Sequence, residues 1–159
     1  MRKQPYVAVC GPGRGNEQEH VWAEEVGRLL ARAGAVLVCG GLGGVMHAAA
    51  RGAEAEGGTS IGVTPGDDRS AASPHLSYVV STGIGEARNA IVVRSADVVI
   101  AISGEFGTLS EIALALKIGR PVVGLGTWEL SKEGHAVDAI VRASTPADAV
   151  ERALALASR

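Results

Sequence analysis

Short apolar runs rich in valine and isoleucine alternate along this chain with segments of helical periodicity. The run at 98–102, VVIAI, has no polar position, which is typical of a strand buried on both faces. Strands are predicted at 6–10, 36–39, 60–64, 78–81, 98–102, 121–125 and 139–143. Helices are predicted at 17–33, 44–56, 86–95, 108–118 and 147–157. This alternation predicts an α/β fold: one parallel sheet with helices on both faces.

Length and charge narrow the class of protein further. The 159 residues, 47% of them hydrophobic, fit a single globular domain over 1–159. The net charge is −2 and no basic run occurs, which argues against a nucleic-acid partner. No apolar run reaches the roughly 18 residues of a membrane span, and the N-terminus lacks the apolar core of a signal peptide. We therefore expect a cytoplasmic protein with no membrane partner.

Two cysteines and one long polar segment each leave alternatives open. Cys10 and Cys39 each precede a glycine at the end of a predicted strand, where a small buried side chain fits. A redox or metal role is the alternative, but no CxxC or Cys/His spacing supports it, so no metal site is predicted. The segment 66–75, GDDRSAASPH, is either an ordinary surface loop or a lid over a site.

Three glycine-rich turns, each between a strand and a helix, are the main functional signal. They are CGPGRGN at 10–16, CGGLGG at 39–44 and SGEFGT at 103–108. The carboxyl ends of parallel strands share one edge of the sheet, where α/β proteins bind ligands. Each following helix would offer unpaired N–H groups to an anion, although glycine also serves plain tight turns. The predicted ligand-binding residues in these turns are Gly11, Gly13, Gly40, Gly41, Gly44, Gly104, Glu105, Phe106, Gly107 and Thr108.

Two common nucleotide sites are disfavoured by what these turns lack. In GPGRGN, Asn16 stands where a dinucleotide-binding turn has its last glycine. The second strand ends in Cys39-Gly40-Gly41 and lacks the acid that would hold the ribose of NAD. No GxxxxGK[ST] run exists, so a P-loop nucleotidase is disfavoured as well.

Two further segments carry charged groups near this edge. GEARNAI at 85–91 places Glu86, Arg88 and Asn89 at a helix start, where arginine suits phosphate and a solvated helix end is the alternative. GTLSE at 107–111 places Glu111 three residues after Thr108. That spacing is also the pattern of a capping box, in which both residues serve only the helix.

The chain resembles a known family in three segments. VCGGLGGVMHAAARGA, TGIGEARNAIVVRSADVVIAI and SGEFGTLSEIALALKIGRPVVGL look like the Lonely-Guy superfamily, long mislabelled as lysine decarboxylases. They cover most of residues 6–128 in the family's order. GEARN, in place of the family's usual MHERK, resembles the short molybdenum-cofactor carrier-like branch. The resemblance implies a Rossmann-like homodimer, often built into a homotetramer.

The same resemblance assigns roles to single residues. Arg88 matches the family arginine and Glu111 the motif glutamate, the two residues that would be catalytic in an enzyme. The glycines at 40, 41 and 44 match the first glycine turn, and Gly104, Gly107 and Thr108 match the phosphate loop. Glu105 departs from the family, because it occupies a glycine position and adds negative charge where phosphate is expected.

Two functions from different classes follow. In a carrier, the protein would hold a phosphorylated pterin such as the molybdenum cofactor without cleaving it and would need no cofactor of its own. In a hydrolase, it would cleave a nucleoside 5′-monophosphate to free base and ribose 5-phosphate, with Glu111 orienting water or steadying the sugar's positive charge and Arg88 holding the phosphate. A regulatory nucleotide sensor is a third alternative.

Overall fold

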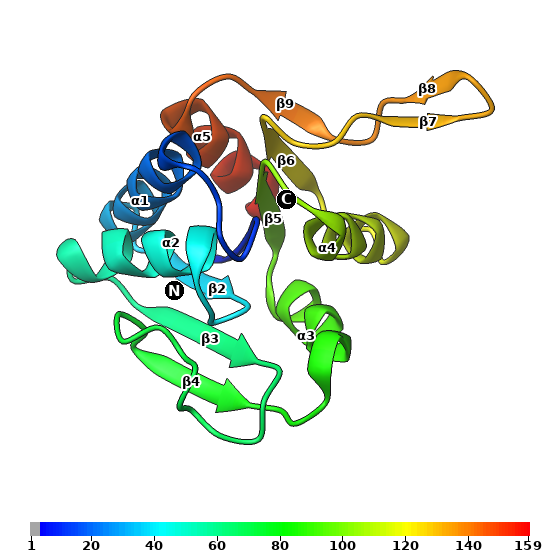
Figure 1. Cartoon of the computed structure of the whole chain (residues 1–159). Coiled ribbons are helices and arrows are strands. Elements are labelled where there is room, and N and C mark those ends of the chain that lie inside the picture. The colour runs from blue at the N-terminus through cyan, green and yellow to red at the C-terminus, as the bar shows by residue number, and fades with distance from the viewer. Residues whose placement is uncertain (1–3) are drawn as a thin grey trace.

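The computed structural model describes residues 4–159 and contains the predicted sheet (Figure 1). Its seven strands are all parallel to their neighbours, in the order β4-β3-β2-β1-β5-β6-β9. They are β1 (Tyr6–Cys10), β2 (Val36–Cys39), β3 (Ser60–Thr64), β4 (Tyr78–Ser81), β5 (Val98–Ile102), β6 (Val122–Leu125) and β9 (Val141–Ala143). The strand order reverses between β1 and β5, which is where open α/β sheets bind ligands.

Helices cover both faces of the sheet, as predicted. They are α1 (Glu17–Arg32), α2 (Gly44–Ala55), α3 (Arg88–Ser95), α4 (Phe106–Lys117) and α5 (Pro146–Ala157). Helices α1, α2 and α5 pack on one face, and α3 and α4 on the other (Figure 1). The α/β, Rossmann-like architecture expected from the sequence is therefore confirmed.

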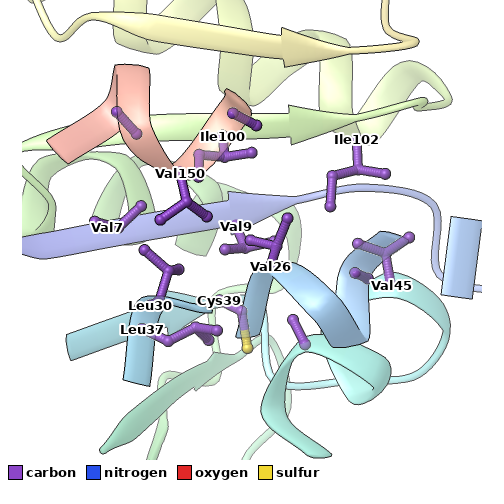
Figure 2. Close-up of a cluster of buried hydrophobic side chains, with 14 of the residues drawn as sticks. Val7, Val9, Val26, Leu30, Leu37, Cys39, Val45, Ile100, Ile102 and Val150 are labelled. Atoms are coloured by element: carbon purple, nitrogen blue, oxygen red, sulfur yellow. The ribbon is translucent and has the colours of Figure 1, made fainter. Parts of the chain in front are cut away.

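Each face of the sheet has its own hydrophobic core. Val9 of β1 and Ile100 of β5 point toward α1, α2 and α5, among the buried side chains that Figure 2 shows. Ala8 and Cys10 of β1 point the other way, toward α3 and α4. Because alternate residues of a strand face opposite sides, a strand buried on both sides has to be apolar throughout. This explains the unbroken apolar runs that identified the strands.

Helices α1 and α2 approach each other so closely that glycine is required on both. A Cβ atom on Gly27 would lie 2.0 Å from the carbonyl oxygen of Ala49, and one on Gly52 would lie 2.0 Å from that of Glu24. Neither glycine has a positive φ, so close packing of the two helices accounts for them. The sequence pattern did not reveal this contact.

A hairpin that the sequence did not predict extends from the body of the protein (Figure 1). It is made of β7 (Leu130–Lys132) and β8 (His135–Val137), which pair antiparallel. Its turn residues, Glu133 and Gly134, both have positive φ, at 51° and 79°. None of the helices within residues 4–159 has the length and apolarity needed to span a membrane.

Candidate functional site

The site is built where the turns after β1, β2 and β5 meet above the reversal of strand order. A crevice of about 480 Å³ lies there, lined by residues 12–16, Glu19 and Glu105. A larger hollow of about 1200 Å³ lies at the opposite edge, near the chain ends, and contains none of the predicted site residues. We locate the site at the first crevice, because the buried charged groups lie beside its loops.

Arg88 is the central charged group of the site. It is the first residue of α3 and is only 8% exposed. Its Nε is buried without a hydrogen-bond partner, and its guanidinium forms no ion pair with any residue in 4–159. Removing a cation from water without an anion beside it costs several kcal/mol. A buried guanidinium with a free N–H is therefore suited to receive an anionic ligand.

Hydrogen bonds tie Arg88 to the first turn of α4. Its Nη1 donates to Oδ1 of Asn89, and Nδ2 of Asn89 donates to Oγ of Ser110 over 3.0 Å. The Ser110 hydroxyl in turn donates to the carbonyl oxygen of Gly107 over 2.6 Å. This relay holds α3 against the start of α4 and gives a partner to both the side-chain oxygen and the side-chain nitrogen of Asn89. Ser110 was not singled out from the sequence, because a serine in a helix carries no motif signal.

Arg88 also lies against the second glycine turn. A Cβ on Gly40 would approach Nη2 of Arg88 to 2.8 Å and Sδ of Met46 to 2.7 Å. Glycine at position 40 therefore makes room for the guanidinium. The structure brings together the predicted residues Gly40, Arg88, Asn89 and Gly107.

The three turns differ in how they leave the following helix. Neither α2, which follows Gly43, nor α4, which follows Glu105, has a side-chain cap. In α2 the Val45 N–H donates to the carbonyl oxygen of Pro12, whereas the first N–H groups of α4 remain open to an anion. Helix α1 is capped by Asn16 and Glu19, each of which accepts a hydrogen bond from the other's backbone N–H. The first turn can therefore contact a ligand through its glycine backbone, but the N-terminus of α1 has fewer free N–H groups for an anion.

The glycines of the site are present for different reasons. Gly41, Gly44 and Gly104 have positive φ, at 77°, 61° and 127°, which their turns require. Gly11 is needed for packing, since its Cβ would lie 2.5 Å from Val45. At Gly107 a Cβ would meet no atom within 4 Å, and its φ is not positive.

Gly13 is nearly as free, with only Cε of Met46 at 4.0 Å from a Cβ built there. The fold itself therefore gives no reason for glycine at positions 13 and 107. Both residues border the crevice or the open end of α4, where a ligand could use the space.

Glu111 is buried beside the first glycine turn and forms a hydrogen bond with a cysteine. It is 8% exposed, and its Oε2 accepts a hydrogen bond from the Cys10 thiol over 2.8 Å. The capping-box alternative for Thr108 and Glu111 is wrong, because α4 begins two residues earlier, at Phe106, and both residues lie inside the helix. Thr108 is buried and packs against Gly104 of the loop before α4.

Burial controls the protonation of this pair. It raises the pKa of Glu111 from 4.5 to about 7, although the thiol hydrogen bond and Arg88 favour the carboxylate. Burial and the neighbouring Glu111 raise the pKa of Cys10 well above its ordinary value, and burial raises that of Cys39 to about 12. Both cysteines are therefore thiols near neutral pH, and both are free and buried. Glu111 can bind or release a proton in this range.

Glu105 and Ser103 complete the loop before α4. The Glu105 side chain is exposed, caps nothing and forms no ion pair within residues 4–159. Ser103 has φ 51°, a conformation that side chains other than glycine seldom adopt. Such strain gathers at ligand-binding positions, and sequence reasoning missed it because serine gives no backbone signal.

The segment 66–75 is fastened to the site at one point. Residues 66–71 are exposed, as a surface loop requires. Ser73 is buried, its N–H donates to the carbonyl oxygen of Gly41, and its Oγ lies 2.9 Å from Nδ1 of His47. Within residues 4–159, no three His, Cys, Asp or Glu side chains come together in a way that could hold a metal ion.

The parallel sheet, with helices on both faces and glycine turns at its carboxyl edge, defines a Rossmann-like α/β protein. The chain belongs to the SLOG cluster4 family, whose model matches residues 4–150. This confirms the superfamily inferred from the sequence. An uncharacterized protein of Archaeoglobus fulgidus is 41% identical over 119 residues, which are 75% of this chain and 78% of that protein.

Two solved structures are similar over almost the whole chain. The molybdenum cofactor binding protein of Rippkaea orientalis has a TM-score of 0.88 and 33% identity, covering 98% of this chain and 99% of its own. The molybdenum cofactor carrier protein of Chlamydomonas reinhardtii has a TM-score of 0.86 and 35% identity, covering 99% and 100%. The likeness to the carrier branch, expected from GEARN, is therefore confirmed at the level of structure.

Proposed function

We propose that this protein is a carrier that binds a phosphorylated pterin of the molybdenum-cofactor type and does not cleave it. The observation that carries the proposal is Arg88, a buried guanidinium whose Nε has no partner and which forms no ion pair among residues 4–159. The ligand's phosphate would accept hydrogen bonds from Arg88 and from the uncapped N-terminus of α4, and each charged hydrogen bond contributes about 1.5–3 kcal/mol. The structural similarity to molybdenum cofactor carrier proteins supports the choice of pterin.

The lining of the site is compatible with such cargo. Gly13 leaves open space at the crevice and Gly107 leaves it at the open end of α4, so a bulky ligand can approach the backbone at both. The exposed carboxylate of Glu105 weakens phosphate binding, although solvent screens a charge in that position. The carrier would act as an oligomer of identical subunits, in line with the family resemblance.

Thermal unfolding with matched ligands tests the proposal. 6-Hydroxymethylpterin phosphate should raise the Tm, and 6-hydroxymethylpterin without phosphate should not. At a ligand concentration about a hundredfold above Kd, the gain is about 2.7 kcal/mol, or roughly 5–10 °C for a chain of this size. Arg88→Met should abolish the shift, while Arg94→Met, an exposed arginine on the same helix, should keep it. Equal shifts with and without phosphate would refute the phosphate anchor.

Glu111 favours a second candidate, hydrolysis of a nucleoside 5′-monophosphate to base and ribose 5-phosphate. A buried carboxyl group with a pKa near 7 is suited to proton transfer at neutral pH. Incubation with AMP, CMP, GMP and UMP, followed by chromatography for free base, tests it. Base release that falls about 10²–10⁴-fold in Glu111→Gln would establish the hydrolase. If none of the four nucleotides releases free base while phosphate-dependent binding is intact, the hydrolase is refuted and the carrier function is supported.

A further inference from the structure

Phe106 occupies an unusual place for the chain's single phenylalanine. It is the first residue of α4, directly between Glu105 and Gly107 in the loop proposed to hold phosphate. Its side chain is 77% exposed, more than any other large hydrophobic residue described. The chain has only five aromatic residues in all. Folding does not require Phe106, because it buries so little of its ring.

A second aromatic residue lies beside it. Trp128 follows β6, the neighbour of β5 in the sheet, and its ring centroid lies 5.8 Å from that of Phe106 with an interplanar angle of 34°. Trp128 packs against the hydrophobic core on the α3 and α4 face of the sheet, and this contact fixes the position of its indole ring. The hydroxyl of Thr127 donates to the carbonyl oxygen of Ser103, tying the Trp128 segment to the loop before α4. Trp128 is therefore held in place before any ligand binds, and Phe106 contacts its ring.

The pair also has an unused hydrogen-bond donor. Nε1 of Trp128 is buried and has no acceptor in the part of the chain that the structure describes. Buried donors nearly always have partners, so an orphaned one calls for an explanation. The indole N–H lies in the plane of its ring, so an acceptor of the ligand beside the stacked ring would supply the missing partner.

We propose that Phe106 and Trp128 form an aromatic platform that binds the flat heterocyclic ring of the ligand. The inference rests on the proposed function, since it takes the ligand's phosphate to lie at the N-terminus of α4. A ring attached to that phosphate would meet Phe106, the next residue along the loop. Stacking on an aromatic face suits pterin and purine rings alike, because each has an extended π-face. Phe106 is then a specificity-determining residue that distinguishes heterocyclic phosphates from sugar phosphates.

Trp128 provides a direct spectroscopic readout. The chain has two tryptophans, so Trp22→Phe leaves Trp128 as the only indole. In this background, 6-hydroxymethylpterin phosphate should quench the tryptophan fluorescence, and ribose 5-phosphate should bind with little quenching. Calorimetry of the same background gives affinities for both probes that do not depend on the fluorescence.

Variants of Phe106 separate stacking from simple contact. Phe106→Ala should weaken the affinity for 6-hydroxymethylpterin phosphate about 5- to 100-fold and leave the affinity for ribose 5-phosphate unchanged. Phe106→Tyr should retain the affinity for 6-hydroxymethylpterin phosphate. Phe106→Leu should show most of the loss of affinity that Phe106→Ala shows. Tyr78→Ala is the matched control, because Tyr78 is also an exposed aromatic residue, 65% exposed, but lies on β4 at the far end of the sheet. It should change neither affinity.

The outcomes distinguish this inference from the proposed function. Unchanged affinity of Phe106→Ala for both probes would overturn the platform and leave the phosphate site standing. Equal losses for both probes would overturn it too, and a changed mass in light scattering would then assign Phe106 to a contact between copies of the chain. If neither probe binds the wild-type protein, the proposed function fails, and the platform with it.

Discussion

Replacing Gly107 by alanine separates the needs of the fold from those of the site. Gly107 is the second residue of α4, has ordinary helical backbone, and has no atom within 4 Å of where a Cβ would stand. Alanine in such a position stabilises a protein by about 0.4–1 kcal/mol, because it restricts the unfolded chain. For a chain of this size that corresponds to a rise in Tm of roughly 1–4 °C.

Ligand binding should change in the opposite direction. A Cβ points toward the N-terminus of its helix, and at α4 this is where the phosphate is proposed to lie. Crowding by an added methyl group in a filled space costs about 1–3 kcal/mol. We therefore expect Gly107→Ala to weaken the affinity for 6-hydroxymethylpterin phosphate roughly 5- to 100-fold. Differential scanning fluorimetry measures the first effect and calorimetry the second.

Gly52→Ala is the matched control for the same chemical change. Its Cβ would lie 2.0 Å from the carbonyl oxygen of Glu24, so α1 and α2 would have to separate. We expect a loss of about 1–3 kcal/mol or more, a fall in Tm of several degrees, and unchanged affinity for the ligand. If Gly107→Ala raised the Tm and left affinity intact, the reasoning that places the ligand at the start of α4 would be refuted.

Three further predictions concern the charged groups. Arg88→Met removes a buried charge that has no ion pair within residues 4–159, but it also removes the hydrogen bond to Oδ1 of Asn89, so we expect the free energy of unfolding to change little; a large fall in Tm would show that Arg88 is structural. The pKa of Glu111 in the folded state, about 7, lies above its ordinary value of 4.5. The free energy of unfolding therefore has the full contribution of protonated Glu111 below pH 4.5 and loses about 3 kcal/mol as the pH rises through 7. Urea unfolding from pH 4.5 to 8 should show this slope in the wild type and not in Glu111→Gln, and equal slopes would contradict the burial argument. Glu105→Gln should tighten AMP binding about 2- to 5-fold at low salt and less at high salt, because the side chain is exposed; no change at either salt would place Glu105 away from the ligand.

The fold could be predicted because its signals are local and repeated. A strand buried on both faces needs an apolar run like that of Val98–Ile102, which ends at a glycine turn. The hairpin Leu130–Val137 was missed because its strands are three residues long and exposed, with no apolar run and no Asn-Gly turn. The contact of Gly27 with α2 was missed because it depends on how two helices meet.

The site could be predicted in its parts but not in its connections. Arg88, Asn89 and Glu111 stood out because charged or amide groups near glycine turns suggest a ligand. Their partners did not, because Cys10 and Ser110 lie far from them in sequence and have no motif of their own. The capping-box pattern of Thr108 and Glu111 was misleading, since the helix starts earlier than the local pattern indicates.

A crystal structure with 6-hydroxymethylpterin phosphate bound tests the central claim most directly. We predict that the phosphate accepts hydrogen bonds from Nε of Arg88 and from the first backbone N–H groups of α4, beside Gly107. Nε, which has no partner in the free protein, would then have one. A phosphate bound elsewhere, or a bound ligand that leaves Arg88 Nε without a partner, would contradict the account.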